Sequence, residues 1–186
     1  MNIEENIDII ISNFNELKKC SGNINKIADI CIDAIEHGNK LLLCGNGGSA
    51  SDAQHIAAEL VVKYKKIRRA IPAIALTTDT SIMTAIGNDI SAEKIFERQV
   101  EALGNKGDIL IAISTSGNSI NIINALNIAK QKGLVTILLT GNNGGSASQI
   151  ASYTLKVPSD TTNNIQELHI ATGHLICDII EEYFSK

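Results

Sequence analysis

Five short apolar runs alternate with helical segments along most of the chain, and this alternation narrows the possible folds more than any other feature. Each run is apolar along most of its length, which is typical of strands buried on both faces of a parallel sheet. The segments between them repeat apolar residues at helical spacing, so helices should cover both faces of that sheet. The expected strands are Lys40–Cys44, Ala73–Leu76, Asp108–Ile113, Val135–Thr140 and Tyr153–Val157. The expected helices that follow them are Ser51–Val62, Glu93–Leu103, Ser119–Lys132 and Asn164–Phe184.

Two further helical patterns precede the first strand, from Ile3 to Lys19 and from about Ile24 to Ile35. Two amphipathic helices alone bury little apolar surface against each other, so we expect them to pack on the sheet or on a partner subunit. No Pro- or Ser-rich linker divides the chain, and 186 residues suit one domain. The sequence therefore predicts an α/β core over residues 38–186, preceded by a helical pair over residues 1–37.

The composition argues against several functional classes. Aromatic residues make up only 3% of the chain, which disfavours stacking platforms for single-stranded nucleic acid. A net charge of -4 gives no general attraction to a phosphate backbone. No apolar run approaches the roughly 18 to 20 residues of a membrane span, and the acidic start is the reverse of a signal peptide. Four scattered cysteines without a CxxC pair should fill apolar space, so we expect a soluble, cytoplasmic protein.

Three strand ends are alike: LLLC-GNGGSAS (41–51), ILIAI-STSGNS (109–119) and TILLT-GNNGGSAS (136–148). Ligands of open α/β sheets bind at the carboxyl ends of strands, where these loops should meet. The first loop fits the loose dinucleotide pattern G-x-G-x-x-A. A dinucleotide site also needs an acidic residue roughly 20 positions later, whereas residues 63–69 here are basic. A dinucleotide is therefore disfavoured, and a tight turn without further function stays open for this loop.

The second loop carries four hydroxyl side chains and a glycine between a strand and a helix start. The hydroxyls belong to Ser114, Thr115, Ser116 and Ser119. Helix N-termini favour anions, and capping explains one hydroxyl but hardly four, so a monophosphate site is the better interpretation. The basic run Lys63–Arg69 is expected to be a solvated loop rather than a nucleic-acid patch, with Lys63 the candidate cation beside a phosphate.

Two helices offer side chains for acid–base chemistry. His55 and Glu59 are four residues apart and share one helical face, as a surface pair, as two metal ligands or as catalytic groups. Two ligands alone make a poor zinc site. Gln166 and His174, eight residues apart, share a broad face of the last helix, whereas His169 points away and is expected to be structural. A carboxylate and a histidine near a phosphate loop suit proton transfer next to a carbonyl. The G-x-S-x-G elbow of serine hydrolases is absent.

Longer motifs resemble the sugar isomerase (SIS) family, in the same order over nearly the whole chain. They are CGNGGSASDAQH (44–55), PAIALTTDTS (72–81), TAIGND (84–89), ISTSGNS (113–119) and VPSDTTNNIQELH (157–169). Within that family the similarity is greatest to members that isomerise heptose phosphates. The resemblance implies one SIS domain over residues 1–186, with a three-layer, flavodoxin-like α/β sandwich and a five-stranded parallel sheet. It also implies a homotetramer with active sites at subunit interfaces, with the two leading helices packed between subunits.

The resemblance implies an aldose–ketose isomerase that converts D-sedoheptulose 7-phosphate into D-glycero-D-manno-heptose 7-phosphate through an enediol. That reaction is the first step toward nucleotide-activated heptose for bacterial surface polysaccharide. Glu59 resembles the base that moves a proton between C1 and C2, and His174 resembles the acid that handles the oxygens. The residues that resemble the phosphate cradle are Ser114, Thr115, Ser116 and Ser119. Those that resemble substrate contacts are Asn46, Gly47, Gly48, Glu59, Asn88, Asp89 and Gln166. Some members bind zinc through residues matching His55, Glu59, Gln166 and His174.

This chain departs from the family at two positions, because Lys63 and Asn164 stand where the family often has Arg. Lys is only a point charge, so contacts to phosphate or sugar are expected to weaken. The main alternative function is a non-catalytic SIS tetramer, either an assembly factor for the replication initiator or a sensor of sugar phosphates. The replication-type relatives lack the Glu and the final His, and this chain has both, at Glu59 and His174. A third interpretation is an isomerase for a phosphosugar of another chain length.

Overall fold

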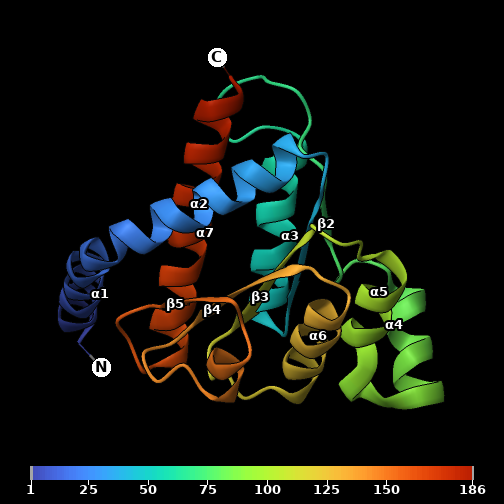
Figure 1. Ribbon diagram of the computed structural model, residues 1–186. Coiled ribbons are helices and arrows are strands. Elements are labelled where there is room, and N and C mark those ends of the chain that lie inside the picture. Colours follow the sequence, from blue (N-terminus) through green and yellow to red (C-terminus); the bar gives the residue numbers. More distant parts are fainter. Residues whose placement is uncertain (1, 186) are drawn as a thin grey trace.

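A computed structural model of the protein describes residues 2–185 (Figure 1). Within this range five parallel strands form one sheet in the order β2-β1-β3-β4-β5. The strands are β1 (Leu41–Gly45), β2 (Ala73–Ala75), β3 (Ile109–Ser114), β4 (Val135–Thr140) and β5 (Tyr153–Lys156). The predicted parallel sheet is therefore confirmed. The ends of β4 agree with the sequence prediction, and the ends of the other strands differ from it by no more than one residue.

Helices cover both faces of the sheet, which confirms the three-layer α/β sandwich. The helices are α1 (Ile3–Leu17), α2 (Ser21–Glu36), α3 (Gly48–Val61), α4 (Thr80–Ile86), α5 (Ile95–Leu103), α6 (Ile120–Gln131) and α7 (Thr162–Phe184). Shorter turns are η1 (Lys18–Cys20), η2 (Gly87–Ser91), η3 (Ala92–Lys94) and η4 (Ser146–Gln149). Helices α2, α3 and α7 pack on one face and α5 and α6 on the other (Figure 1). Within β1, Leu41 and Leu43 belong to the first core layer and Leu42 to the second, as the two-residue period of a strand requires.

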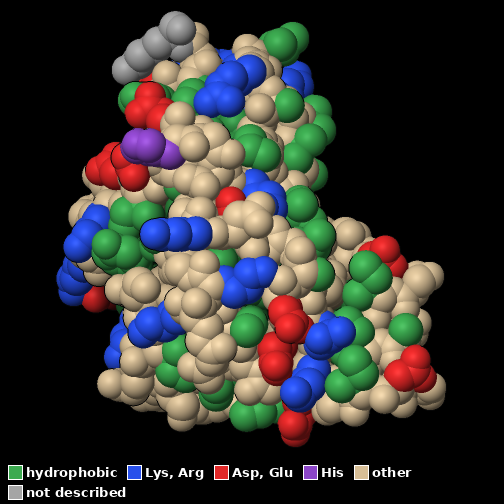
Figure 2. Space-filling model, turned by 45° about the vertical axis from the view of Figure 1, so that its right-hand side comes forward, with side chains coloured by type: hydrophobic (Ala, Val, Ile, Leu, Met, Phe, Trp, Pro, Cys, Tyr) green, Lys and Arg blue, Asp and Glu red, His purple; other side chains and the backbone are tan. Residues whose placement is uncertain are grey.

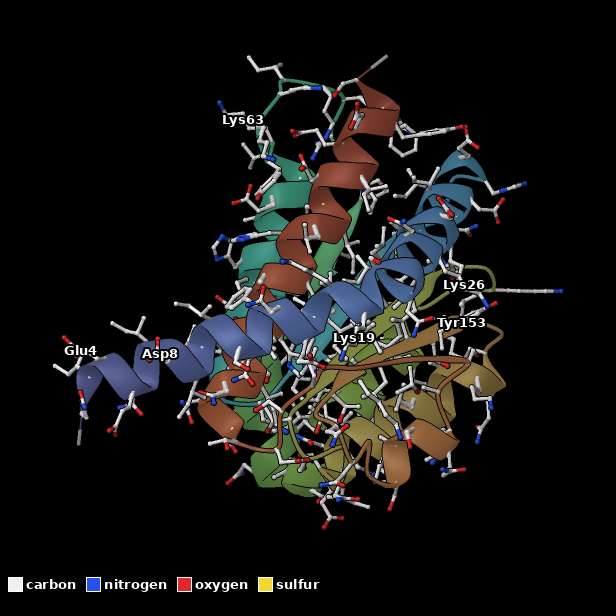
Figure 3. The ribbon with its side chains drawn as sticks, turned by 90° about the vertical axis from the view of Figure 1, so that its left-hand side faces the viewer. Glu4, Asp8, Lys19, Lys26, Lys63 and Tyr153 are labelled. Atoms are coloured by element: carbon white, nitrogen blue, oxygen red, sulfur yellow. The ribbon has the colours of Figure 1, made fainter. Side chains whose placement is uncertain are left out.

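The two leading helices join through η1 into one long helical rod, and α1 projects beyond the body of the molecule (Figure 3). Leu17 is the buried residue of α1, whereas Ile3, Ile7 and Phe14 are 69%, 49% and 40% exposed. Figure 3 shows Glu4 and Asp8 at the far end of this projection. Helix α2, by contrast, places an apolar face on the core. Much of the apolar face of α1 is thus uncovered within one chain.

The segment from α4 to η2 differs from the sequence prediction. No helix was predicted there because its apolar residues do not form a buried stripe: α4 has no buried residue, and Ile82 is 40% exposed. Asp79 nevertheless starts the helix, since its Oδ1 accepts a hydrogen bond from the N–H of Ile82 at 2.9 Å. Asn88 and Asp89 consequently lie in a π-helical turn at the end of this helix, and do not directly follow a strand.

The remaining surface and thiol features are unexceptional. No helix in the described range is long and apolar enough to cross a membrane. Burial raises the pKa of Cys31 and Cys44 to about 12, as expected for thiols that fill apolar space. Figure 2 shows acidic side chains among the Lys and Arg side chains of the face it presents.

The strand order reverses between β1 and β3. Helix α3 follows β1 and packs on one face of the sheet, whereas α6 follows β3 and packs on the other. The two connections therefore separate at the carboxyl ends of these strands and leave a crevice there. Ligands of open α/β sheets bind at this reversal point.

Candidate active site

The glycine loop after β1 leads directly into α3. Gly47 has φ +54°, a left-handed conformation that favours glycine, and α3 begins at the next residue, Gly48. A Cβ on Gly48 would lie 2.6 Å from Nε2 of Gln166, so a side chain here would displace that amide. Because α3 begins at Gly48, three residues before the predicted start at Ser51, His55 and Glu59 lie about two and three turns into it, one turn further than the predicted start would place them.

The hydroxyl-rich loop after β3 is held in shape by its own backbone. The side-chain oxygens of Ser114 and Ser116 accept hydrogen bonds at 3.1 Å from the N–H groups of Gly117 and Asn118. Each hydroxyl keeps its own proton to donate to a ligand. Ser119 is the N-cap residue of α6, yet its side chain makes no capping hydrogen bond. The loop therefore presents hydroxyl donors at the positive end of a helix, as an anion site requires.

The third strand-end loop supports the second. Gly117 has φ +63°, and a Cβ there would lie 2.0 Å from the carbonyl oxygen of Gly144. The N–H of Ala147 donates to the carbonyl of Gly117 at 2.8 Å, and the N–H of Ser146 donates to Oδ1 of Asn118 at 2.9 Å. The three similar loops thus do gather at one sheet edge, but this one acts as a scaffold for its neighbour.

A small cavity of about 50 Å³ lies at the reversal point of the strand order. It is lined by Asn46, Ser49, Ile113, Ser114, Thr115, Ser119 and Gln166. The amides of Asn46 and Asn121 exchange two hydrogen bonds, of 3.0 and 2.9 Å, which tie the glycine loop to α6. The structure thus brings together predicted residues from the first loop, the second loop and the last helix. Asn121 was not predicted, because one asparagine on a helix gives no sequence signal.

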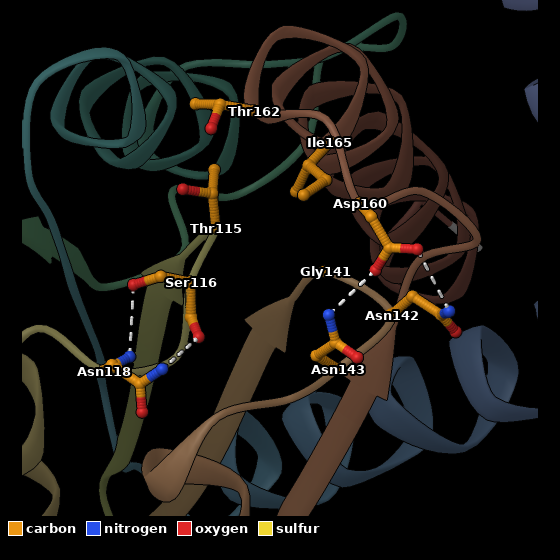
Figure 4. Close-up of a pocket in the computed structure, with 9 residues that line it drawn as sticks. All are labelled: Thr115, Ser116, Asn118, Gly141, Asn142, Asn143, Asp160, Thr162 and Ile165. Carbon is orange, nitrogen blue, oxygen red and sulfur yellow. Dashed lines mark hydrogen bonds between the residues drawn. The ribbon is translucent and has the colours of Figure 1, made fainter.

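A larger hollow of about 280 Å³ shares Thr115 with the small cavity. Figure 4 shows its lining, which is Thr115, Ser116, Asn118, Gly141, Asn142, Asn143, Asp160, Thr162 and Ile165. Asp160 accepts a hydrogen bond from Nδ2 of Asn143 at 3.0 Å. The hollow combines the predicted Thr115 and Ser116 with polar residues that sequence reasoning did not select.

His55, Glu59 and His174 converge where α3 passes α7. Nε2 of His55 lies 3.3 Å from Oε1 of Glu59 and 3.3 Å from Nε2 of His174. The two helices approach closely because residue 173 is glycine: a Cβ there would lie 2.5 Å from Cδ1 of Ile56. The side chain of Glu59 is 23% exposed and that of His55 48% exposed, so ligands can reach the cluster.

These three side chains also form a candidate metal centre. Their ligand atoms all lie within 4.8 Å of one another. A tetrahedral zinc ion with bonds of about 2.0–2.1 Å would hold its ligand atoms about 3.4 Å apart. The two distances of 3.3 Å at His55 match that spacing. Two imidazoles and a carboxylate are a donor set that suits a divalent transition metal, and two of their three separations match the expected spacing.

Gln166 lies apart from this cluster. It precedes His174 by two turns of α7, about 12 Å along the helix axis, and its amide lies against Gly48. Its role as a fourth metal ligand stays a prediction. Asn88 and Asp89 are exposed, bond to each other at 2.7 Å and line neither hollow. Their predicted contacts with substrate also stay untested.

Lys63 is not near the hydroxyl loop of its own chain. Figure 3 shows it just beyond the C-terminal end of α3. Residues 114–119 meet the glycine loop beside the other end of that helix. Within one protomer Lys63 is therefore too distant to serve as the predicted cation beside a bound phosphate.

Asp52 lies one turn before His55 on α3, partly buried, and its Oδ2 has no hydrogen-bond partner among the described residues. Burial raises the pKa of this carboxyl to about 6, although His55 acts to lower it. The pKa of Asp52 is higher in the folded protein than in the unfolded chain, so protonation of Asp52 favours the folded protein. This contribution to stability is fully present below pH 3.8 and is lost as the pH rises through about 6.

We expect Asp52→Asn to raise the melting temperature at about pH 8 and to leave it almost unchanged at about pH 4. Thermal melts at both pH values, with Asp178→Asn as control, check this; a lower melting temperature at the higher pH would contradict it.

His169 faces the sheet and is fully buried, away from both hollows. Burial lowers its pKa to about 4, and the carbonyl of Thr140 opposes the shift only partly. The imidazole is therefore neutral at physiological pH. This position is in accord with the structural role expected from the sequence.

Comparison with known proteins agrees with this geometry. The SIS domain model matches residues 5–141. The phosphoheptose isomerase of Akkermansia muciniphila is 52% identical over 172 residues, which are 92% of this chain and 91% of that protein. The phosphoheptose isomerase of Aquifex aeolicus is 60% identical over 156 residues, 84% of this chain and 82% of that one. The structure of the phosphoheptose isomerase of Neisseria gonorrhoeae aligns with a TM-score of 0.91 at 40% identity, over 97% of each chain. The chain therefore belongs to the SIS domain family.

Proposed function

We propose that the chain is an aldose–ketose isomerase that converts D-sedoheptulose 7-phosphate into D-glycero-D-manno-heptose 7-phosphate. This step begins the synthesis of nucleotide-activated heptose for bacterial surface polysaccharide. The observation that carries the proposal is the convergence of Glu59 and His174 in a chain that has a hydroxyl-lined anion loop. Relatives that are 52% and 60% identical over most of their length bear the name phosphoheptose isomerase.

The phosphate of the substrate binds at the hydroxyls of residues 114–119, at the N-terminus of α6. The hydroxylated carbon chain runs past Asn46, Gly47, Gly48 and Gln166. Gly48 lies about 16 Å from Glu59 along α3, which is longer than an extended seven-carbon phosphate. This separation supports an active site that the loop of one protomer and the Glu59 region of another complete together.

Isomerisation requires two proton movements and no net oxidation. The carboxylate of Glu59 takes a proton from C1 of the ketose, and the electron pair of that C–H bond forms the C1–C2 double bond of an enediol. His174 moves a proton from O1 to O2, so that the carbonyl passes from C2 to C1. Glu59 then returns its proton to C2 and gives the aldose. A positioned base and acid contribute about 10²–10⁴-fold each to reactions of this kind.

The resident metal in this proposal is zinc, one ion per subunit, held by His55, Glu59 and His174. The sequence prediction of Gln166 as a fourth ligand is not met within one protomer, where Gln166 lies two turns of α7 from His174. When bound, zinc would polarise the carbonyl of the substrate as a Lewis acid. The support in this structure is the donor set and its spacing. Glu59 would then serve both as metal ligand and as base. These two roles compete, because a carboxylate that binds a metal tightly is less free to accept a proton.

The proposed assembly is a homotetramer with active sites at subunit interfaces. The support is the exposed apolar face of α1, where Ile3, Ile7 and Ile11 are 69%, 49% and 54% exposed. Such a face is stabilised when another subunit covers it. The proposed location is the cytoplasm, because all four cysteines are free thiols, which suit a reducing compartment.

The purified protein is expected to convert sedoheptulose 7-phosphate into the aldose. Aldose formation is followed by coupled assay or by NMR, with fructose 6-phosphate as the comparison for substrate chain length. A higher kcat/KM for fructose 6-phosphate would support an isomerase for another phosphosugar. A complete lack of turnover, with tight binding of the sugar phosphate, would support the sensor or assembly-factor alternative, which the identities of the relatives do not favour.

A further inference from the structure

The basic loop, residues 63–69, is anchored to the last helix through its backbone. The carboxylate of Glu181 accepts hydrogen bonds from three consecutive N–H groups: Tyr64 at 2.7 Å, Lys65 at 2.6 Å and Lys66 at 2.7 Å. Burial of Glu181 acts to raise its pKa, but these bonds outweigh burial and hold that pKa below its usual value. The lysine side chains of the loop are exposed, as the sequence predicted. The backbone is not a freely solvated loop.

Arg68 adds a second attachment, at the end of the helix that carries Glu59. Its side chain is 1% exposed, and Nη2 donates to the backbone carbonyl of Glu59 at 2.7 Å. Its Nε lies 3.8 Å from Oε2 of Glu181. The buried guanidinium thus links the loop, α3 and α7.

The anchored backbone places one aromatic side chain against the candidate acid. The ring of Tyr64 stacks on the imidazole of His174, with centroids 5.3 Å apart and planes inclined by 30°. His55 meets the same imidazole edge-on, with a centroid distance of 4.9 Å and an angle of 72°. His174 is therefore held between two rings.

The contact of its Nε2 with His55 at 3.3 Å fixes only one edge of the His174 imidazole. The terminal torsion of a histidine side chain is broad, so the neighbouring groups decide where its nitrogen atoms point. A stacked ring restricts rotation of the imidazole out of its plane while leaving the edge nitrogens free to exchange protons. The contact thus suits a group that must present one nitrogen to a reacting oxygen.

We infer that the basic loop is a positioning device, in which Glu181 fixes the backbone and the ring of Tyr64 orients His174 for proton transfer. This inference rests on the proposed function, because Tyr64 acts only through His174. The aromatic ring and the backbone N–H groups carry the role, whereas the lysine charges do not. Tyr64 is thus a positioning residue for the isomerisation, and Glu181 is its anchor.

The first test compares two substitutions of Tyr64. We expect Tyr64→Leu to lower kcat for sedoheptulose 7-phosphate by up to about 10²-fold, with KM nearly unchanged, because a misplaced catalytic group slows the chemical step. Tyr64→Phe keeps the ring and is expected to retain the wild-type kcat. Tyr183→Leu is the matched control, since Tyr183 lies on α7 but bonds to Glu36 at 2.7 Å, outside this cluster. An unchanged kcat in Tyr64→Leu would overturn the inference. A loss of kcat in Tyr64→Phe equal to that in Tyr64→Leu would also overturn it, because the hydroxyl of Tyr64 and not its ring would then be the group that matters.

The second test examines the anchor. Glu181→Gln is expected to lower kcat as Tyr64→Leu does, and the double variant is expected to lose no more than the larger single loss, because both changes disable one device. Asp178→Asn is the control: it removes a carboxylate on the same helix that bonds only the Lys65 side chain, at 2.7 Å. Losses that multiply in the double variant would show that Glu181 does not act through Tyr64. If Glu181→Gln does not fold, the comparison of the two Tyr64 variants still decides.

A readout without turnover separates this inference from the proposed function. The ring-proton NMR signals of His174, assigned by comparison with His174→Gln, feel the ring current of Tyr64. We expect these signals to move in Tyr64→Leu and Glu181→Gln but to stay in place in Tyr64→Phe and Asp178→Asn. Signals unmoved in Tyr64→Leu would exclude the stacking contact. A wild-type protein without isomerase activity but with these shifts would refute the proposed function alone.

Discussion

Glu59→Gln lowers kcat for sedoheptulose 7-phosphate by roughly 10²–10⁴-fold, the range that a general base contributes. The amide cannot accept the C1 proton, whereas its shape preserves packing in the groove between α3 and α7. We expect the dissociation constant of the substrate to change little, because the phosphate contacts are made by residues 114–119 and not by Glu59. Turnover is measured by aldose formation and binding by calorimetry.

A control variant and two further measurements make this test specific. Glu101→Gln is the matched control, because Glu101 lies on α5 and its exposed carboxylate pairs with Arg98, at 2.6 Å, away from the cluster. Zinc content is measured in parallel, since Glu59 belongs to the candidate metal cluster. In D₂O the wild type should incorporate deuterium at C2 of the aldose to the extent that the proton on Glu59 exchanges with solvent before it is returned. A Glu59→Gln protein with wild-type turnover would remove Glu59 from the mechanism.

The second large effect is acid destabilisation through His169. Its pKa falls from 6.5 to about 4 because the ring is buried, so the unfolded chain binds the proton more readily than the folded one. The contribution of neutral His169 to the stability of the folded protein is therefore fully present above pH 6.5 and is lost as the pH falls toward about 4. The loss is about 3 kcal/mol, because each unit of pKa corresponds to about 1.4 kcal/mol. Urea unfolding at fixed protein concentration, between these pH values, measures it.

Asp52 acts in the opposite direction over nearly the same interval, since its pKa is raised from 3.8 to about 6. The loss of stability on acidification should therefore be larger in an Asp52→Asn background, where the opposing group is removed. His169→Gln should lower stability at neutral pH but flatten its dependence on pH. A wild-type dependence that survives intact in His169→Gln would show that another group causes the acid transition.

The strands and the order of layers could be predicted because each strand is a short, mostly apolar run between helical patterns. Helix starts were less certain, because they depend on backbone conformation. The residue types of the glycine loop predict a turn, and only the left-handed φ of Gly47 shows that α3 begins at Gly48. Helix α4 was missed because it has no buried residue to give a periodic signal.

The site could be predicted in residue types but not in groupings. Gln166 and His174 share a broad face of α7, but a shared face does not imply a shared height, and the rise of a helix separates them by two turns. The contact between Tyr64 and His174 joins residues more than a hundred positions apart. The pairing of Asn46 with Asn121 and the support that Gly144 gives to Gly117 likewise depend on tertiary packing, which no local pattern records.

Helix α7 supplies Gln166, His174 and Glu181, and it is synthesised after every other element of this fold. Residues of α7 also complete the apolar core on one face of the sheet, among them Ile165, Leu168 and Ile180. A chain that stops before α7 therefore lacks both this core surface and, under the proposed function, the acid and the anchor of the basic loop. Premature termination before residue 162 is expected to give a product that neither buries this face of the sheet nor turns over a sugar phosphate.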